Sequence, residues 1–209
     1  MSVERVVGAF PDILRRPTDE VLTRFRARGS RLILHWWAFM LSGIFFLPVA
    51  VLLPIIVGGG LLVPIATAVG ILAAAVQVIG LLRWVYLVPY LARTNTDATA
   101  SPAMREAVRV VFESFHRFLG VGVGEHLGYL FTGVWTVLIG IAMISGTAFA
   151  GWLGWVAVIV GAGLVVFSTE FLGPREERGW SLAGKAVPIL YILWSLWLVV
   201  VGLMLLLRT

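Results

Sequence analysis

Cysteine is absent from the 209-residue chain, and charged residues are scarce. Without cysteine there are no disulfides, thiolate nucleophiles, cysteine zinc sites or iron–sulfur clusters, and the redox compartment stays undecided. Charged residues make up 13% of the chain and hydrophobic residues 60%, whereas soluble domains average roughly 25% and 45–50%. A single soluble core of this size cannot bury so much apolar surface, so the surplus must face lipid.

The common catalytic motifs are also missing. The chain contains no His-Glu-x-x-His, phosphate loop, Gly-x-Ser-x-Gly or histidine box. Zinc proteolysis, nucleotide hydrolysis, triad esterase chemistry and di-iron desaturation therefore have no support. Residues 122–128 resemble a dinucleotide-binding glycine motif, but they contain one residue too many and lie in an apolar run.

The apolar residues are arranged in long runs. Residues 32–82 contain no charged side chain, a length about twice the roughly 20 residues that cross a bilayer as a helix. The triplet 58–60, all glycine and flanked by prolines, marks a turn within this run. The pattern predicts an all-α integral membrane helical bundle with five transmembrane helices in one transmembrane domain, residues 31–207. The predicted spans are 32–57, 61–91, 120–145, 148–172 and 186–207.

The basic residues indicate the orientation of these spans. The chain has 16 Lys and Arg against 11 Asp and Glu, a net charge of +5. All the basic residues except Arg208 precede span 1 or lie around the connections between spans 2 and 3 and between spans 4 and 5. By the positive-inside rule the N-terminus is cytoplasmic and the C-terminus is outside, in a multi-pass protein of the cell inner membrane. Because topology accounts for the positive charge, no nucleic acid partner is expected.

Residues 1–30 are predicted to form a cytoplasmic basic amphipathic segment. Thr18 is a candidate N-cap for a short helix, in which Val21, Leu22 and Phe25 oppose several arginines. This pattern suits a cationic helix lying on an anionic leaflet. A solvated positive tail that only sets orientation is the alternative.

A second amphipathic helix is predicted at residues 102–119. Ser101 is its expected N-cap and Pro102 its first helical residue. Apolar residues then recur with a helical period opposite charged ones. The pattern favours an interfacial helix on the cytoplasmic surface, and a helix continuous with span 3 is the open alternative.

Several segments together resemble a known family. They are Phe118–Trp135, which reads FLGVGVGEHLGYLFTGVW, the segment Trp152–Trp155 and the final run Tyr191–Leu207. These features resemble small bacterial multi-pass membrane proteins that carry the domain of unknown function catalogued under number 4386. The likeness covers roughly residues 30–207. It implies a bacterial membrane protein and, because the family has no known activity, nothing about chemistry.

Span 3 carries two stripes of residues at helical spacing. The first is a polar stripe, which must face protein or a cavity. Its members are Glu125, Tyr129, Thr132 and Thr136. The second consists of Gly120, Gly124 and Gly128, whose four-residue spacing permits close approach of another helix.

Polar and aromatic side chains inside the spans define a candidate site. A charge near the bilayer centre costs on the order of 2.5–3.5 kcal/mol, so such residues are informative. On the predicted topology the ionisable ones lie toward the cytoplasm, which favours a polar pocket opening there. The alternative is an ion pair that only fixes helix register. The candidate pocket residues are Gln77, Arg83, Glu125, Tyr129, Thr132, Trp135, Glu170, Tyr191 and Trp194.

Three functional hypotheses follow from this pattern. The first is an accessory or lipophilic-ligand-binding subunit without catalysis, whose partners are membrane lipids and a protein or a second copy. The second is a membrane-embedded enzyme on a lipid or isoprenoid substrate, with Glu125 as general acid or base tuned by His126 or Arg83. The third is a small transporter, or a haem-binding subunit using His35 and His126 as axial ligands. The sequence identifies no other cofactor or metal.

Overall fold

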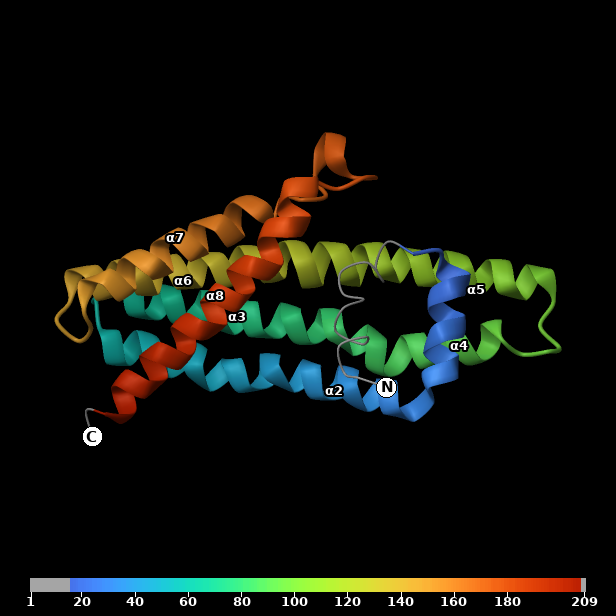
Figure 1. Cartoon of the computed structure of the whole chain (residues 1–209), viewed down its shortest axis with the longest axis horizontal. Coiled ribbons are helices and arrows are strands. Elements are labelled where there is room, and N and C mark those ends of the chain that lie inside the picture. The colour runs from blue at the N-terminus through green and yellow to red at the C-terminus, as the bar shows by residue number, and fades with distance from the viewer. Residues whose placement is uncertain (1–15, 208–209) are drawn as a thin grey trace.

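The computed structural model describes residues 16–207 and, within that range, contains helices and no β-strand. It is an all-α membrane helical bundle, as the sequence predicted. Most helices run side by side along the long axis of the molecule, while α8 crosses them obliquely (Figure 1). The α-helices are α2 (Thr18–Val57), α3 (Leu62–Leu82), α4 (Val88–Asn95), α5 (Pro102–Phe115), α6 (Gly128–Ser145), α7 (Gly151–Phe167) and α8 (Ser181–Leu206). The remaining turns are two π-helices, η2 (Arg83–Leu87) and η3 (His116–Leu127), and a 3₁₀ turn, η4 (Gly173–Arg175).

Within the described residues, four helical stretches are long and apolar enough to cross a membrane. They are Thr18–Val57, Leu62–Asn95, Pro102–Ser145 and Ser181–Leu206. The fifth apolar helix, α7, has 17 residues, which corresponds to about 25 Å at roughly 1.5 Å per residue. This is shorter than the roughly 30 Å hydrocarbon core, and the count of five spans stays a prediction.

The triple-glycine turn joins α2 to α3 as predicted. Gly58, Gly59 and Gly60 have φ values of 77°, 113° and 59°. Residues with a Cβ rarely adopt this left-handed backbone conformation, because the Cβ clashes with the backbone. Three glycines in a row therefore allow the chain to reverse within a few residues. The turn lies at the same end of the bundle as the α6–α7 turn (Figure 1).

Helix α5 continues through η3 into α6, so the chain is helical from Pro102 to Ser145 over 44 residues. Figure 1 shows this stretch as one long rod. The expectation of a separate interfacial helix at 102–119 is therefore wrong, and the continuous alternative is the one observed. The cause is local: the glycines of η3 do not break the helix but widen it to π-helical turns. Ser101 caps α5 as predicted, because its hydroxyl accepts the Met104 N–H at 3.2 Å.

The first helical segment of α2, residues 18–28, turns away from the bundle axis and crosses α4 and α5 (Figure 1). The change of direction occurs at Gly29, with φ 56° and ψ −148°. Its apolar side chains Val21, Leu22 and Phe25 are buried in one cluster with Trp84 and Phe112. Protein therefore covers this apolar face, whereas the position of the helix on an anionic leaflet stays a prediction. We call residues 18–28, α4 and α5 together the head.

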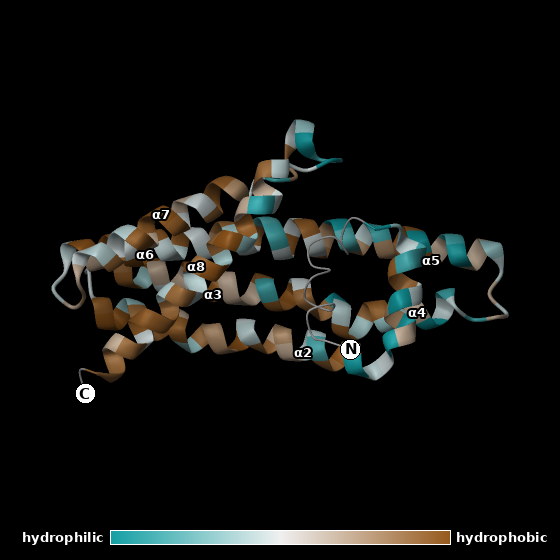
Figure 2. Cartoon of the chain, in the orientation of Figure 1, coloured by the Kyte–Doolittle hydropathy of each residue, from teal (hydrophilic) through white to brown (hydrophobic). Residues whose placement is uncertain are grey.

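Thr18 does not cap this segment, because Pro17 occupies the N-cap position. Instead, the Thr18 hydroxyl donates to the Glu113 carboxylate on α5 at 3.0 Å. The residues before 16 in the predicted basic segment lie outside the described part of the chain. Hydrophobic residues dominate the bundle, whereas hydrophilic ones gather in the head and in the connection between α7 and α8 (Figure 2).

Candidate functional site

The predicted polar stripe of α6 lies at a junction of three helices. The Gln77 side-chain amide on α3 donates to the Thr132 hydroxyl at 3.0 Å. On the same face of α6, Tyr129 contacts Tyr191 of α8, with ring centroids 5.5 Å apart. One turn beyond Thr132 on α6, Thr136 accepts the indole N–H of Trp194 at 2.9 Å. These polar groups therefore hold α3 and α8 onto α6 at defined positions.

Arg83 lies at the other end of the stripe, where α3 passes into η2. The residue is buried, and its guanidinium lies against the Gly120 backbone and 5.2 Å from the Trp84 ring centroid. The Nε and Nη1 atoms of the guanidinium are buried without a hydrogen-bond partner, and the Glu125 carboxylate is the negative charge that acts on it. An arginine beside a carboxylate in a low-dielectric setting is a neutralising arrangement, because either charge alone is costly there. The Glu125 position therefore fits the ion-pair alternative raised from the sequence.

The glycine stripe of η3 and α6 makes this arrangement possible. Gly124 packs on Gly80, so that a Cβ added at Gly80 would lie 2.6 Å from the Gly124 Cα. Gly120 faces Arg83 in the same interface, and Gly128 faces Gln77. The glycine stripe predicted that another helix approaches closely along it. The structure confirms this prediction and shows that the other helix is α3 with η2.

The large aromatic side chains pack against one another inside the bundle. The indole N–H of Trp135 donates to the Ala50 carbonyl at 3.4 Å, and that of Trp197 donates to the Leu153 carbonyl at 3.1 Å. Thr132, Trp135 and Thr136 have no exposed surface. These three residues therefore belong to a packed hydrogen-bond network, and a ligand pocket beside it stays a prediction. The indoles fill helix interfaces, because each N–H finds an acceptor inside the bundle.

Glu170 and the two candidate haem ligands have separate surroundings. The sequence indicated a helix to residue 172, but α7 ends at Phe167, so Glu170 lies in the turn after it and is buried beside Gly179. His126 contacts the Ser168 carbonyl through Nδ1 at 2.9 Å. His35 is exposed on α2 and contacts the Arg31 carbonyl of its own helix at 2.6 Å. The structure thus directs these two histidines toward different neighbours, and among the described residues no group of three His, Cys, Asp or Glu could hold a metal ion.

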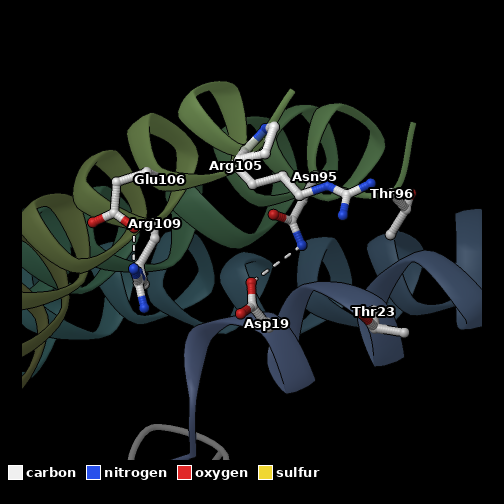
Figure 3. A pocket seen from close by; sticks show the side chains of 8 residues that line it. Asp19, Thr23, Asn95, Thr96, Arg105, Glu106 and Arg109 are labelled. Atoms are coloured by element: carbon white, nitrogen blue, oxygen red, sulfur yellow. Dashed lines mark hydrogen bonds and ion pairs between the residues drawn. The ribbon is translucent and has the colours of Figure 1, made fainter. Parts of the chain in front are cut away.

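A cavity of about 530 Å³ lies in the head, away from the network. It is formed where residues 18–28, the end of α4 and the start of α5 meet (Figure 3). Its lining is almost entirely polar: Asp19, Thr23, Asn95, Thr96, Pro102, Arg105, Glu106 and Arg109.

Sequence reasoning missed this cavity, because its lining residues come from three segments, one of which is far from the other two in the sequence.

Two hydrogen bonds within the loop beside the cavity hold it in place. The Asp97 carboxylate accepts the Thr99 hydroxyl at 2.6 Å and the Thr99 backbone N–H at 2.8 Å. These hydrogen bonds, the hydroxyl contributing most, lower the pKa of Asp97 below its ordinary value because they favour the charged form. The pair fixes the connection between α4 and α5.

Comparison with known proteins gives one family. The family model described as Domain of unknown function (DUF4386) matches residues 5–202. Neither the curated proteins nor the solved structures contain a match. The matched range covers all the described helices except the last residues of α8. The chain therefore belongs to the DUF4386 family, whose members share a domain of unknown function.

Proposed function

We propose that this protein is a non-catalytic accessory subunit of a bacterial inner membrane, which presents the head to a partner protein in the cytoplasm. The single observation that carries this proposal is the continuation of two apolar helices into a packed head with its own core. Val111 lies 34 residues before the end of α6 at Ser145, whereas about 20 residues cross the hydrocarbon core. The head therefore extends into water.

The orientation proposed for the head follows from the distribution of charge. Arg24, Arg26, Arg28, Arg105 and Arg109 belong to it, whereas the turns at 58–61 and 146–150 contain no basic residue. The positive-inside rule then places the head in the cytoplasm, with five spans and an external C-terminus.

The polar network argues against the enzyme and transporter hypotheses. Its hydroxyl, amide and indole groups are hydrogen-bonded to one another or to a backbone carbonyl, so within the described residues these groups are engaged in packing. Beyond Thr136, toward the triple-glycine end, the α6 side chains in the core are Ile139, Ala142 and Met143. A polar path along α6 would end there.

The partner surface proposed for the head is an apolar patch on α5. Met104, Val110, Val111 and Phe115 are between 37% and 54% exposed although they lie outside the lipid zone. Adjoining apolar side chains that face water are typical of protein–protein contact sites. Charged side chains of the same helix border the patch, so the complementary surface is the apolar face of an amphipathic helix.

Site-specific photo-crosslinking tests this proposal. A photoreactive amino acid is placed at Val111 in the full chain and, as a control, at the exposed Arg93 on α4. We expect one discrete protein adduct from position 111 and none from position 93, and loss of the adduct when Phe115 is replaced by Glu in the same chain. Lipid adducts alone, or equal adducts from both positions, would contradict the proposal. An adduct with a second copy would identify the partner as the protein itself.

A further inference from the structure

The cavity in the head has the composition of a binding site for a polar molecule. Its volume of about 530 Å³ is within the range of small-molecule pockets. Seven of the eight side chains that line it are polar or charged, and they come from three helical segments that the head core holds in place. The cavity is separate from the α5 patch, so this inference goes beyond the proposed function.

Asn95 supplies an unused acceptor in this cavity. The side chain is only 8% exposed, and its amide N–H donates to the Asp19 carboxylate at 3.4 Å. Its Oδ1 atom is buried and has no hydrogen-bond partner. Figure 3 shows Asn95 between Asp19 and Arg105. A buried acceptor without a donor is costly, so a molecule that brings an N–H group beside Asp19 would be favoured here.

Arg105 supplies an available positive charge on the other side. The second arginine of the cavity, Arg109, is paired with Glu106 on the same helix, whereas Arg105 has no ion pair within residues 16–207. Arg105 lies in the first turn of α5, where the helix dipole also favours an anion. A guanidinium at a helix N-terminus is well suited to a phosphate group.

We propose that the cavity binds a small zwitterion that joins a phosphate ester to an ammonium group. The phosphate lies on Arg105 and the start of α5, and the ammonium donates to Asn95 Oδ1 beside the Asp19 carboxylate. Inorganic phosphate alone would leave the Asn95 acceptor unpaired, and a simple amine would face two arginines without an anion. Both halves of the molecule are therefore required for tight binding.

This chemistry has two sources, a free metabolite and the headgroup of phosphatidylethanolamine. The test measures binding of O-phosphoethanolamine by calorimetry to the full chain in phosphatidylglycerol nanodiscs. Ethanolamine and inorganic phosphate are measured separately. A second series uses nanodiscs that contain phosphatidylethanolamine, where competition by the lipid identifies the headgroup as the source and unchanged binding identifies a free solute.

Two matched variants locate the site. Arg105→Gln removes the phosphate partner, and Arg93→Gln removes an equal charge from the exposed end of α4, outside the cavity. We expect phosphoethanolamine to bind at least tenfold more tightly than phosphate or ethanolamine, with tenfold weaker binding in R105Q and wild-type binding in R93Q.

Equal affinity for phosphate alone, equal effects of the two variants, or no binding at millimolar phosphoethanolamine would overturn the proposal. Photo-crosslinking from Val111 needs no added ligand, so failure of this proposal is distinguishable from failure of the proposed function.

Discussion

Replacing Gly80 by Ala tests whether α3 and the η3–α6 rod are held at backbone contact. An added Cβ would lie 2.6 Å from the Gly124 Cα and 3.1 Å from the Leu119 carbonyl oxygen. Carbon atoms normally pack at about 3.5–4.0 Å, so the two helices must separate by roughly 1 Å. Neither obstacle is a flexible side chain that can rotate away.

The magnitude follows from two opposing effects. Overpacking of this kind costs about 1–3 kcal/mol, whereas Ala improves the helix propensity by about 0.5–1 kcal/mol over Gly. We therefore expect Gly80→Ala to lower the free energy of unfolding by about 1–2 kcal/mol. The assay is reversible unfolding in mixed micelles, followed by tryptophan fluorescence.

The matched control is Gly202→Ala in α8, where an added Cβ meets nothing within 4 Å. This variant gains propensity without overpacking, so its stability should equal or slightly exceed that of the wild type. If Gly80→Ala is as stable as Gly202→Ala, the close packing of the two helices through glycine is refuted.

Three further predictions concern the charges and the head. Arg83→Met should cost about 3 kcal/mol because it leaves the Glu125 charge uncompensated, and adding Glu125→Gln should recover much of that loss in a double-mutant cycle; additive losses would contradict the ion pair. Leu22→Ala, at a fully buried position of the head, should cost about 2–5 kcal/mol and make residues 18–28 sensitive to protease, whereas unchanged proteolysis would show that the segment is not docked. The pKa of Asp97 is lower in the folded chain than its ordinary value, so its contact with Thr99 stabilises the loop fully above the ordinary pKa and is lost as pH falls through the lowered value. We therefore expect the backbone amides of the loop to exchange faster at acidic pH. The Asp97→Asn variant should not show this change.

Most of the fold could be predicted from the hydropathy pattern and from the residues that form turns. The triple glycine at 58–60 and the cap at Ser101 were predicted correctly because each depends on a local backbone property that a few residues determine. The glycine stripe from Gly120 to Gly128 likewise predicted a helix contact. Its partner, α3 with η2, became visible only in the folded chain, because packing between distant segments leaves no local signal in a single sequence.

The errors have a common physical cause. An amphipathic helix has the same pattern whether its apolar face meets lipid or protein, so residues 18–28 and 102–119 were assigned to the membrane surface although they contact each other. Similarly, a polar stripe is compatible with a cavity and with a packed network. The hydrogen bonds of Thr132 and Thr136 identify the network.

The cavity in the head could not be predicted, because it requires the kink at Gly29 to bring Asp19 beside Asn95. Both residues individually are ordinary helix-end residues. The arrangement depends on the positive φ at Gly29, and many glycines in a helical sequence pattern do not adopt such a φ. The sequence pattern alone therefore does not show that the helix kinks there.

Labelling of single cysteines tests most directly whether the head projects into the cytoplasm from a membrane-spanning bundle. The chain has no native cysteine, so Ala98→Cys in the α4–α5 loop and Thr147→Cys in the α6–α7 turn each create one exposed thiol. With a membrane-impermeant maleimide on intact spheroplasts, we predict that T147C reacts and that A98C reacts only after permeabilisation. Reaction of A98C in intact spheroplasts, or of both variants equally, would contradict this account.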